Sequence, residues 1–288
     1  MKILILGADG MLGHQLIESY RGKHETVGTY RRSSHNYTDL TNYLADQCYY
    51  NIEATDFDSI EKLISHVNPT AVINAIGIVK QRDKEQEIVS SIKINSLLPH
   101  QLAVFCQKQG TRLIHISTDC VFSGKRGCYL ESDVPDAEDI YGRTKLLGEV
   151  TGAGCLTLRT SIIGLELSRK KSLIEWFLTQ KDSVQGFRNA VYSGFTTIEM
   201  ARIIEKILLY FPDASGLYHL SSKPIDKFNL LVSLNNLLGN PTTITENVDF
   251  NCDRSLSSQR FKETFNYTPP EWPFMLAELA TQIKNRYQ

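Results

Sequence analysis

Short apolar runs alternate with longer stretches of helical periodicity along the first half of the chain. The runs predict buried strands at Lys2–Leu6, Thr26–Tyr30, Ala71–Ala75, Arg112–Ser117 and Leu156–Arg159, with Tyr50–Glu53 as a shorter candidate. The stretches between them predict helices at Met11–Arg21, Phe57–Val67, Glu85–Gln109 and Ile140–Val150. This alternation predicts an α/β fold with a doubly wound, parallel Rossmann sheet and right-handed crossovers.

The alternation breaks down after Ser161. Helices are expected at Ile198–Tyr210, Phe228–Leu237 and Phe274–Arg286, around a short strand at Leu217–Ser221. We therefore expect residues 1–160 to bind a dinucleotide and residues 161–288 to form a smaller α+β lobe, mainly for substrate, with some segments returning to the first domain. The lobe should pack at the carboxyl ends of the strands, where open α/β sheets bind ligands. The polar stretch Ser33–Gln47 predicts a loop or short excursion, and no chemistry is assigned to it.

Composition is that of an ordinary globular protein. With 288 residues and 42% hydrophobic content, the chain can bury a sizeable core. A net charge of −1 gives no reason to expect a nucleic acid or an anionic membrane as partner. Because there is no signal-peptide pattern and no apolar stretch long enough to span a bilayer, a cytoplasmic location is expected. The six cysteines lack C-x-x-C pairs and predict reduced structural thiols with no metal site; Cys120, just past a strand end, is the one to watch.

The first strand runs directly into glycines at positions 7, 10 and 13, and a helical pattern follows. Strand, glycine turn and helix together are the context of a dinucleotide-binding fingerprint, although the spacing here is G-x-x-G-x-x-G. Glycines permit a tight turn and close approach of the backbone to a pyrophosphate, which rests on the helix N-terminus. The alternative is an ordinary strand–helix turn. The predicted cofactor contacts in this turn are Gly7, Asp9, Gly10, Met11, Leu12 and Gly13.

The end of the second strand indicates which dinucleotide is preferred. An acidic residue there accepts hydrogen bonds from the ribose 2′-hydroxyl of NAD, whereas an arginine suits the 2′-phosphate of NADP. This strand ends in Arg31 and Arg32, without an acid. Guanidinium groups can bind a phosphate through paired, charge-assisted hydrogen bonds. The prediction is NADP(H) as the preferred cofactor, with NAD(H) still usable; solvated surface arginines are the alternative.

Tyr141 and Lys145 stand four residues apart within a helical pattern, so they lie on one face of the helix. A free tyrosine titrates near ~10, which makes it a poor proton shuttle at neutral pH. A cation one turn away favours the phenolate, so the pKa of Tyr141 is expected to be lowered, as general acid–base catalysis near neutrality requires.

Taken together, Gly7/Gly10/Gly13, Ser117-Thr118-Asp119 and Tyr141-x-x-x-Lys145 resemble the extended short-chain dehydrogenase/reductase family. Within it, the segments 115–122, 141–149 and 158–161 are similar to dTDP-4-dehydrorhamnose reductases, with the likeness strongest over residues 1–165. The resemblance implies NADPH-dependent reduction of a nucleotide-activated 4-keto-6-deoxy sugar in bacterial-type surface polysaccharide biosynthesis. It also implies a nucleotide sugar as the small-molecule partner, and it is compatible with a homodimer.

The resemblance also implies roles for single residues. Tyr141 would protonate the substrate oxygen, and Lys145 would also hydrogen-bond the nicotinamide ribose. Thr118 would hydrogen-bond the carbonyl oxygen, with Ser117 as the alternative hydroxyl. Further cofactor contacts would come from Asp56 and Phe57 at the adenine, Asn74, Ala75 and Gly77 under the cofactor, and Asn95 near the active site. For Asn74 and Asn95 a capping or turn role is the alternative.

The substrate half departs from the reductase pattern. The family carries a Trp after the sixth strand, where this chain has Ile162-Ile163-Gly164, and an Arg-Pro pair where this chain has Phe250-Asn251. The candidate substrate contacts are Ser117, Thr118, Ser161, Gln185 and Arg254.

Two other functions share the fold. One is a nucleotide-sugar epimerase or dehydratase that retains NAD, against which Arg31 and Arg32 argue. The other is a noncatalytic, NADP-binding regulatory subunit, which the intact set of Thr118, Tyr141 and Lys145 disfavours.

Overall fold

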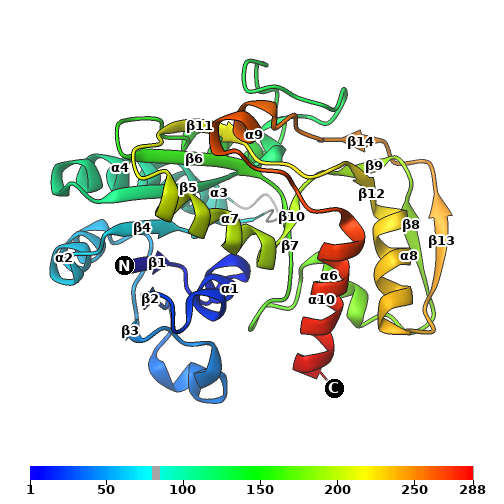
Figure 1. Cartoon of the computed structure of the whole chain (residues 1–288), viewed down its shortest axis with the longest axis horizontal. Helices are drawn as coiled ribbons and strands as arrows, with labels where there is room; N and C mark the ends of the chain where they lie inside the picture. Colours follow the sequence, from blue (N-terminus) through cyan, green and yellow to red (C-terminus); the bar gives the residue numbers. More distant parts are fainter. Residues whose placement is uncertain (80–84, 288) are drawn as a thin grey trace.

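The computed structural model describes residues 1–79 and 85–287. Within these residues a seven-stranded parallel sheet has the order β11-β6-β5-β4-β1-β2-β3. Its strands, which fill the left side of Figure 1, are β1 (Lys2–Leu6), β2 (Glu25–Thr29), β3 (Gln47–Tyr49), β4 (Ala71–Asn74), β5 (Arg112–Thr118), β6 (Cys155–Thr160) and β11 (Gly216–His219). The predicted α/β fold with a doubly wound parallel sheet is confirmed.

Helices cover both faces of this sheet, because its strands are apolar on both sides. Leu4 and Leu6 of β1 pack with α2 (Phe57–Val67) and α4 (Leu98–Gln109). The alternate residues Ile3 and Ile5 face α1 (Met11–Tyr20) and α7 (Thr197–Tyr210). The period of two along the strand thus divides the core into two layers.

The chain after β6 builds a lobe of short strands and helices, seen on the right of Figure 1. Its small sheets pair β7 (Ile162–Ile163) with β10 (Phe195–Thr196), β8 (Ser183–Phe187) with β13 (Thr243–Asn247), and β9 (Ala190–Tyr192) with β12 (Ile225–Asp226) and β14 (Cys252–Asp253). Its helices are α6 (Leu173–Leu178), α8 (Lys227–Leu238) and α10 (Trp272–Tyr287). Three later segments return to the sheet, since β11 pairs with β6, α7 packs on α1, and α9 (Gln259–Phe265) packs on β11. The domain boundary at residue 160 stays a prediction.

One sequence-based element is wrong in its bounds. The strand expected at Tyr50–Glu53 is instead β3, which pairs with β2 and ends at Tyr49, and Asn51 beyond it adopts a left-handed φ of 58°. The loop or short excursion expected at Ser33–Gln47 is an excursion with 3₁₀ turns from Ser34 to Tyr43. The helix expected over Glu85–Gln109 is continuous but contains a π-helical turn, η2, at Ile92–Leu97 between α3 (Glu85–Ser91) and α4.

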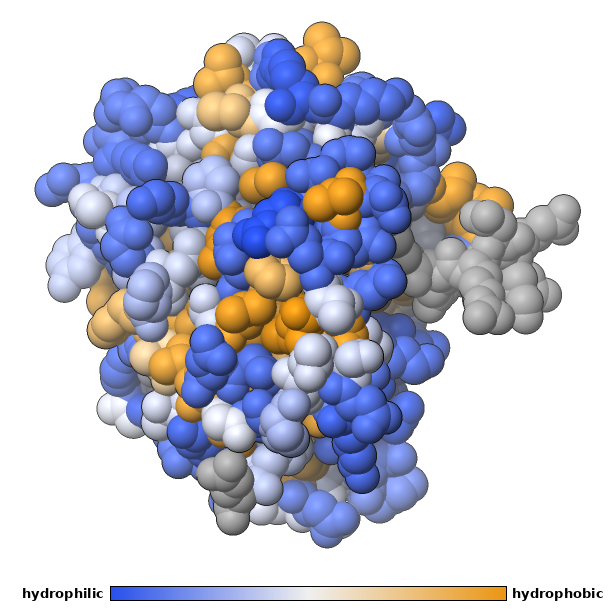
Figure 2. All heavy atoms as spheres, turned by 90° about the vertical axis from the view of Figure 1, so that its right-hand side faces the viewer, coloured by the Kyte–Doolittle hydropathy of each residue, from blue (hydrophilic) through white to orange (hydrophobic). Residues whose placement is uncertain are grey.

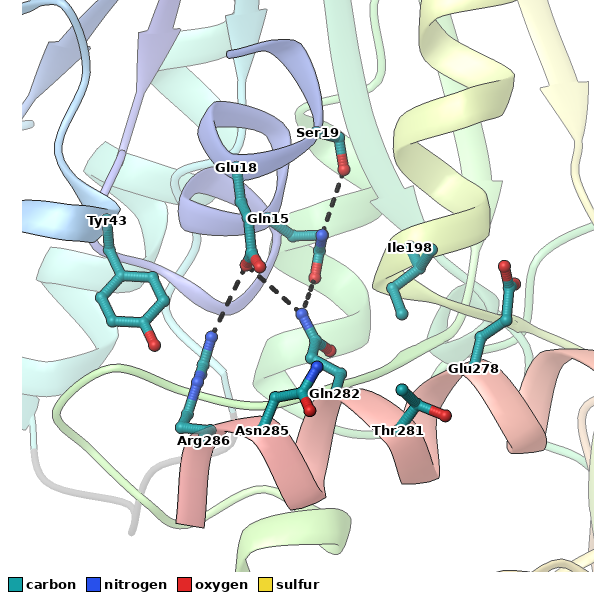
Figure 3. Close-up of a pocket in the computed structure, with 10 residues that line it drawn as sticks. All are labelled: Gln15, Glu18, Ser19, Tyr43, Ile198, Glu278, Thr281, Gln282, Asn285 and Arg286. Atoms are coloured by element: carbon teal, nitrogen blue, oxygen red, sulfur yellow. Dashed lines mark hydrogen bonds and ion pairs between the residues drawn. The ribbon is translucent and has the colours of Figure 1, made fainter. Parts of the chain in front are cut away.

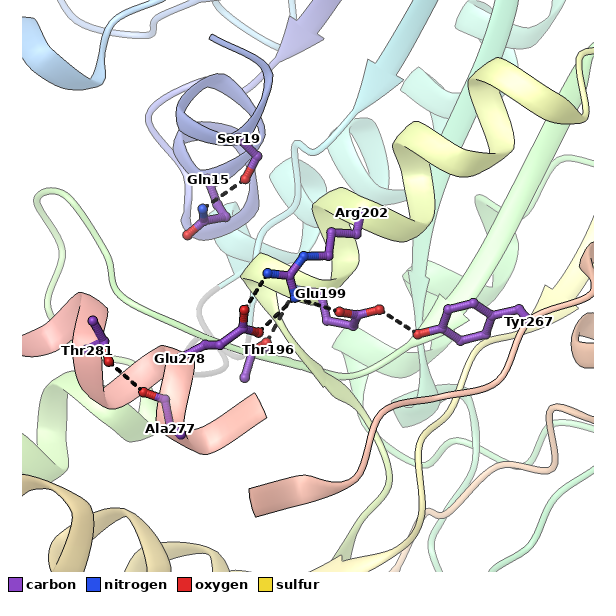
Figure 4. A network of polar contacts seen from close by, with 9 residues as sticks. All are labelled: Gln15, Ser19, Thr196, Glu199, Arg202, Tyr267, Ala277, Glu278 and Thr281. Atoms are coloured by element: carbon purple, nitrogen blue, oxygen red, sulfur yellow. Dashed lines mark hydrogen bonds and ion pairs between the residues drawn. The ribbon is translucent and has the colours of Figure 1, made fainter. Parts of the chain in front are cut away.

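A polar network ties the lobe to the sheet (Figure 4). Arg202 of α7 donates to Glu278 of α10 at 2.7 Å and to Glu199 at 3.0 Å. Tyr267 in turn donates to Glu199 at 2.8 Å. Because Glu199 is almost fully buried, these bonds satisfy a carboxylate that would otherwise be costly, and they fix α10 against α7.

The lobe presents a mostly hydrophilic face with an apolar patch near its middle (Figure 2). Half-exposed apolar side chains of the lobe include Val248, Phe250 and Phe274. Among the described residues, no helix is long and apolar enough to cross a membrane.

Candidate active site

The glycine turn after β1 has the geometry that a dinucleotide requires. Gly7 has a φ of 80°, and the Gly10 amide donates to the Gly7 carbonyl at 3.0 Å. A Cβ on Gly13 would lie 2.1 Å from that same carbonyl oxygen, so only glycine fits. No side chain of the described residues caps the N-terminus of α1, which leaves its first-turn N–H groups available for an anion. These residues fit the pyrophosphate of a dinucleotide.

The arginines at the end of β2 differ in their surroundings. Arg31 is exposed and forms an ion pair with Glu53, Nε to Oε2 at 3.2 Å. Arg32 is exposed too, and its side chain has no ion pair within the described part of the chain. Of the two guanidiniums, Arg32 is therefore the more available for a 2′-phosphate.

The adenine contacts expected at Asp56 and Phe57 stay predictions. Asp56 caps α2, accepting from the amide of Ser59 at 3.2 Å and from its hydroxyl at 2.6 Å. Phe57 is half-buried, with its ring 6.4 Å from that of Phe105. Both residues thus have local structural roles at the start of α2.

Helix α5 (Ile140–Leu147) carries Tyr141 and Lys145 and lies unusually close to its neighbours. A Cβ on Gly142 would lie 2.2 Å from the Cys120 carbonyl oxygen, and one on Gly148 would lie 1.9 Å from that of Asn95. These two glycines therefore allow backbone-to-backbone contact that a larger residue would block. As a result Tyr141 lies next to the turn that follows β5.

The structure brings Tyr141 and Thr118 together, with a hydrogen bond between their hydroxyls. Thr118 ends β5, donates to Asp119 Oδ1 at 3.2 Å and accepts from the Cys120 amide at 3.1 Å. Burial, followed by the neighbouring Cys120, raises the pKa of Tyr141, while the bond with Thr118 acts in the opposite direction. The expectation of a lowered pKa is thus wrong for this structure, because the desolvation of the phenol dominates.

Lys145, the other member of the predicted pair, is itself buried. It is 4% exposed, and its ammonium donates to the Ile116 carbonyl at 2.6 Å. Burial lowers the pKa of Lys145 to about 8, with Glu149 acting in the opposite direction. The ammonium is thus satisfied by the backbone of β5, and near pH 8 it becomes neutral.

Ser117 takes part in a different network behind the sheet end. Its hydroxyl donates to Glu149 at 2.7 Å, and Glu149 forms a buried ion pair with Arg159 of β6, also at 2.7 Å. Arg159 further contacts His219 of β11 at 3.2 Å. Because adjacent strand residues point to opposite faces, Thr118 and not Ser117 faces Tyr141. Thr118 is the hydroxyl that this geometry favours.

The two asparagines hold the loop after β4. Asn74 contacts His115 at 3.1 Å and accepts from the Ile76 amide at 3.2 Å. Asn95, in η2, accepts from the Ile78 amide at 2.9 Å and donates to its carbonyl at 3.0 Å. The structure thus gives both residues turn-fixing roles in the loop 75–78, in which Ala75 lies beside Gly7. The cofactor contacts that stay predictions are those of Asn74, Ala75, Gly77 and Asn95.

On the substrate side, the structure gathers some candidates and separates another. Arg254 donates to the Phe122 carbonyl at 2.9 Å and to Cys120 Sγ at 3.5 Å, which places it beside Asp119. Ser161 hydrogen-bonds the buried Asp119, whose pKa burial raises. Gln185 lies instead on β8, where it accepts from Asn247 of β13 at 3.1 Å.

Sequence reasoning missed Tyr192 of β9. It is 7% exposed, donates to the Phe195 carbonyl at 3.0 Å and also hydrogen-bonds Ser161. Burial and the nearby Asp119 raise its pKa. No local pattern marks Tyr192, because its link to Asp119 exists only once the lobe has packed on the sheet.

A surface pocket of about 440 Å³ lies elsewhere, between α1 and α10 (Figure 3). Across it, the amide nitrogen of Gln282 donates to Gln15 and to Glu18. None of its lining residues belongs to the predicted site, so it is separate from the Thr118–Tyr141 centre. Among the described residues, no group of three or more His, Cys, Asp or Glu is placed to hold a metal ion.

Comparison with known proteins matches residues 1–229 to the family described as RmlD substrate binding domain. The chain is 31% identical over 147 residues to dTDP-4-keto-6-deoxy-D-glucose reductase of Streptomyces niveus, a match that covers 51% of this chain but only 45% of that protein. It is 25% identical over 235 residues to dTDP-4-dehydrorhamnose reductase of Aggregatibacter actinomycetemcomitans, covering 77% and 74% of the two chains. The crystal structure of dTDP-4-dehydrorhamnose reductase from Bacillus anthracis, in complex with NADP, superposes with a TM-score of 0.77 at 19% identity, covering 98% of this chain and 99% of that one.

Proposed function

Because the chain belongs to the RmlD substrate binding domain family, we propose that it is an NADPH-dependent reductase of a nucleotide-linked 4-keto-6-deoxy sugar. The observation that carries the proposal is the hydrogen-bonded pair of Thr118 and Tyr141 at the carboxyl end of β5. This pair supplies two hydroxyls to one carbonyl oxygen, in a fold whose glycine turn suits a dinucleotide. The protein is thus an oxidoreductase that forms a sugar hydroxyl, with a role in polysaccharide sugar biosynthesis.

When bound, the cofactor supplies a hydride to the keto carbon. Thr118 hydrogen-bonds the carbonyl oxygen and stabilises the negative charge that grows on it. Tyr141 gives that oxygen its proton. Burial raises the pKa of Tyr141, so the phenol holds its proton at neutral pH, but the same shift makes that proton harder to transfer. The hydrogen bond with Thr118 acts against this shift.

Arg254 and Ser161 are the proposed contacts for the nucleotide part of the substrate. Arg254 lies beside Asp119 and Cys120, the two residues that follow Thr118, and a guanidinium suits a diphosphate. Remote binding of the nucleotide would hold the keto carbon in place, so that orientational freedom is lost on binding and not in the chemical step. Gln185 contributes through β8 if the nucleotide extends that far along the lobe.

Oxidation of NADPH with a panel of nucleotide-linked keto sugars tests the proposal. The purified chain should consume one NADPH per 4-keto-6-deoxy sugar carried on dTDP or another nucleotide, and little with the free keto sugar. Retention of a tightly bound NAD without net consumption would favour epimerase or dehydratase chemistry. Cofactor binding without turnover of any such sugar would favour a regulatory subunit.

A further inference from the structure

The 3₁₀ excursion from Ser34 to Tyr43 places one tyrosine against the dinucleotide turn. Tyr37 is 3% exposed, and its hydroxyl donates to Asp9 Oδ2 at 2.7 Å. The hydroxyl oxygen of Tyr37 in turn accepts from the Arg32 amide at 3.3 Å. A single hydroxyl therefore connects the glycine turn after β1 with the end of β2.

This is the place where the two dinucleotides differ. With the pyrophosphate on the glycine turn, the adenosine ribose lies between that turn and the end of the second strand. A carboxylate there accepts from the 2′-hydroxyl of NAD and repels the 2′-phosphate of NADP, and an arginine does the reverse. The chain carries both kinds of group at this position, Asp9 in the turn and Arg32 after β2.

We infer that Tyr37 is a specificity-determining residue, which favours NADP(H) by donating a hydrogen bond to the carboxylate of Asp9. The inference rests on the proposed dinucleotide site. A phenol that donates to a carboxylate satisfies part of its charge and fixes its position. Asp9 is then a weaker partner for a ribose hydroxyl and a weaker opponent of a phosphate, and Arg32 determines the preference.

The surroundings of Tyr37 hold its hydroxyl in place. Its ring centroid lies 5.1 Å from that of Tyr30 and 5.9 Å from that of Tyr50. Tyr30 also accepts from the Ala45 amide at 3.0 Å, which anchors the end of the excursion. Burial, followed by Asp9, raises the pKa of Tyr37, so the phenol stays protonated and remains a donor.

Direct titration of NADPH and NADH, read as a change in cofactor or protein fluorescence without substrate, tests the inference. Tyr37→Phe keeps the ring and removes the hydroxyl, and it should lower the ratio of NADPH to NADH affinity about tenfold, chiefly by weakening NADPH. In an Asp9→Asn background, Tyr37→Phe should leave the ratio of NADPH to NADH affinity constant, because position 9 then carries no negative charge for the hydroxyl to offset. Tyr50→Phe, from the same aromatic cluster, is the matched control and should also leave the ratio unchanged.

Equal weakening of both cofactors by Tyr37→Phe would overturn the inference and reduce Tyr37 to a packing residue. If that variant does not fold, Asp9→Asn alone decides: its ratio should equal or exceed that of the native protein, and a fall would contradict the inference. Failure of the native protein to bind either dinucleotide would overturn the proposed function and the inference together.

Discussion

The sheet domain and the lobe position their site residues in different ways. In the sheet domain, Gly142 and Gly148 bring the backbone of α5 directly against the backbone of neighbouring segments, which fixes the helix that carries Tyr141 beside the end of β5. In the lobe, strands of two to five residues pair in small sheets, and Arg254 reaches the site from a short segment beside β14. We therefore propose that the closely packed sheet domain carries the chemistry and that the lobe contributes to the choice of substrate.

The charged groups of the sheet domain and of the lobe also differ in how deeply they are buried. Near the end of β5 the charged groups Lys145, Glu149 and Arg159 are almost fully buried and each has a specific partner. In the lobe, Arg188 and Glu246 form an ion pair at 2.8 Å that is partly exposed. Loss of a buried partner is costly, whereas exposed pairs contribute little. Substitutions of paired charges should therefore lower the stability much more in the sheet domain than in the lobe.

Tyr141→Phe should have the largest effect on the sheet domain. It keeps the ring, so folding and cofactor binding should survive, while turnover falls by roughly 10²–10⁴, the usual contribution of a positioned general acid. Steady-state NADPH oxidation measures this, with the exposed Tyr210→Phe as control. Retention of more than about a tenth of native turnover, with chemistry rate-limiting, would mean that another group supplies the proton.

Glu149→Ala should give the largest loss of stability. It leaves the buried Arg159 without its carboxylate and Ser117 without its acceptor, which should cost about 3–5 kcal/mol of unfolding free energy. Glu138→Ala, which removes the exposed partner of Lys125, should leave that free energy nearly unchanged. Denaturant titration of both variants measures the difference, and similar losses would contradict the distinction drawn here.

Lys145 makes the stability of the sheet domain depend on pH. Its folded pKa of about 8 lies below the ordinary value of 10.5, so the unfolded chain binds more protons between these two values. Stability should therefore rise with pH across that window, by at most about 3 kcal/mol, because the burial cost of the charge is relieved. Lys145→Met should lack this rise. Unfolding curves at pH 7 to 10 measure it, and parallel profiles for the two proteins would refute the assignment.

Arg254→Gln and Arg32→Ala should have the smallest effects, and each should weaken the binding of a different ligand. Loss of Arg254 should raise the KM for the nucleotide sugar about tenfold and leave the NADPH affinity unchanged, since its contacts lie on the substrate side.

Loss of Arg32 should weaken the binding of NADPH about tenfold, with little effect on the binding of NADH. Arg31→Ala should do less, because Glu53 already holds that guanidinium. If Arg254→Gln and Arg32→Ala each weakened the binding of both the nucleotide sugar and NADPH, the assignment of the two arginines to different ligands would be contradicted.

The sequence alone predicts the features that depend on local spacing, and it fails for those that depend on packing between distant segments. Gly7, Gly10 and Gly13, and the pair of Tyr141 and Lys145, are close in sequence, so local spacing was enough to predict their arrangement. The burial of Tyr141 depends on packing among distant segments, so the direction of its pKa shift was predicted wrongly. Tyr192 could not be found either, because short strands such as β9 leave no periodic signal.

The most direct test of the central claim uses NADPH that carries deuterium at the transferable position of its nicotinamide. The account predicts that a dTDP-linked 4-keto-6-deoxy sugar gains one deuterium at C4 for each NADPH consumed, as read by mass spectrometry and NMR of the product. It also predicts that Tyr141→Phe slows this transfer without changing its position. Turnover of the sugar with no deuterium at C4, or with no net loss of NADPH, would contradict it.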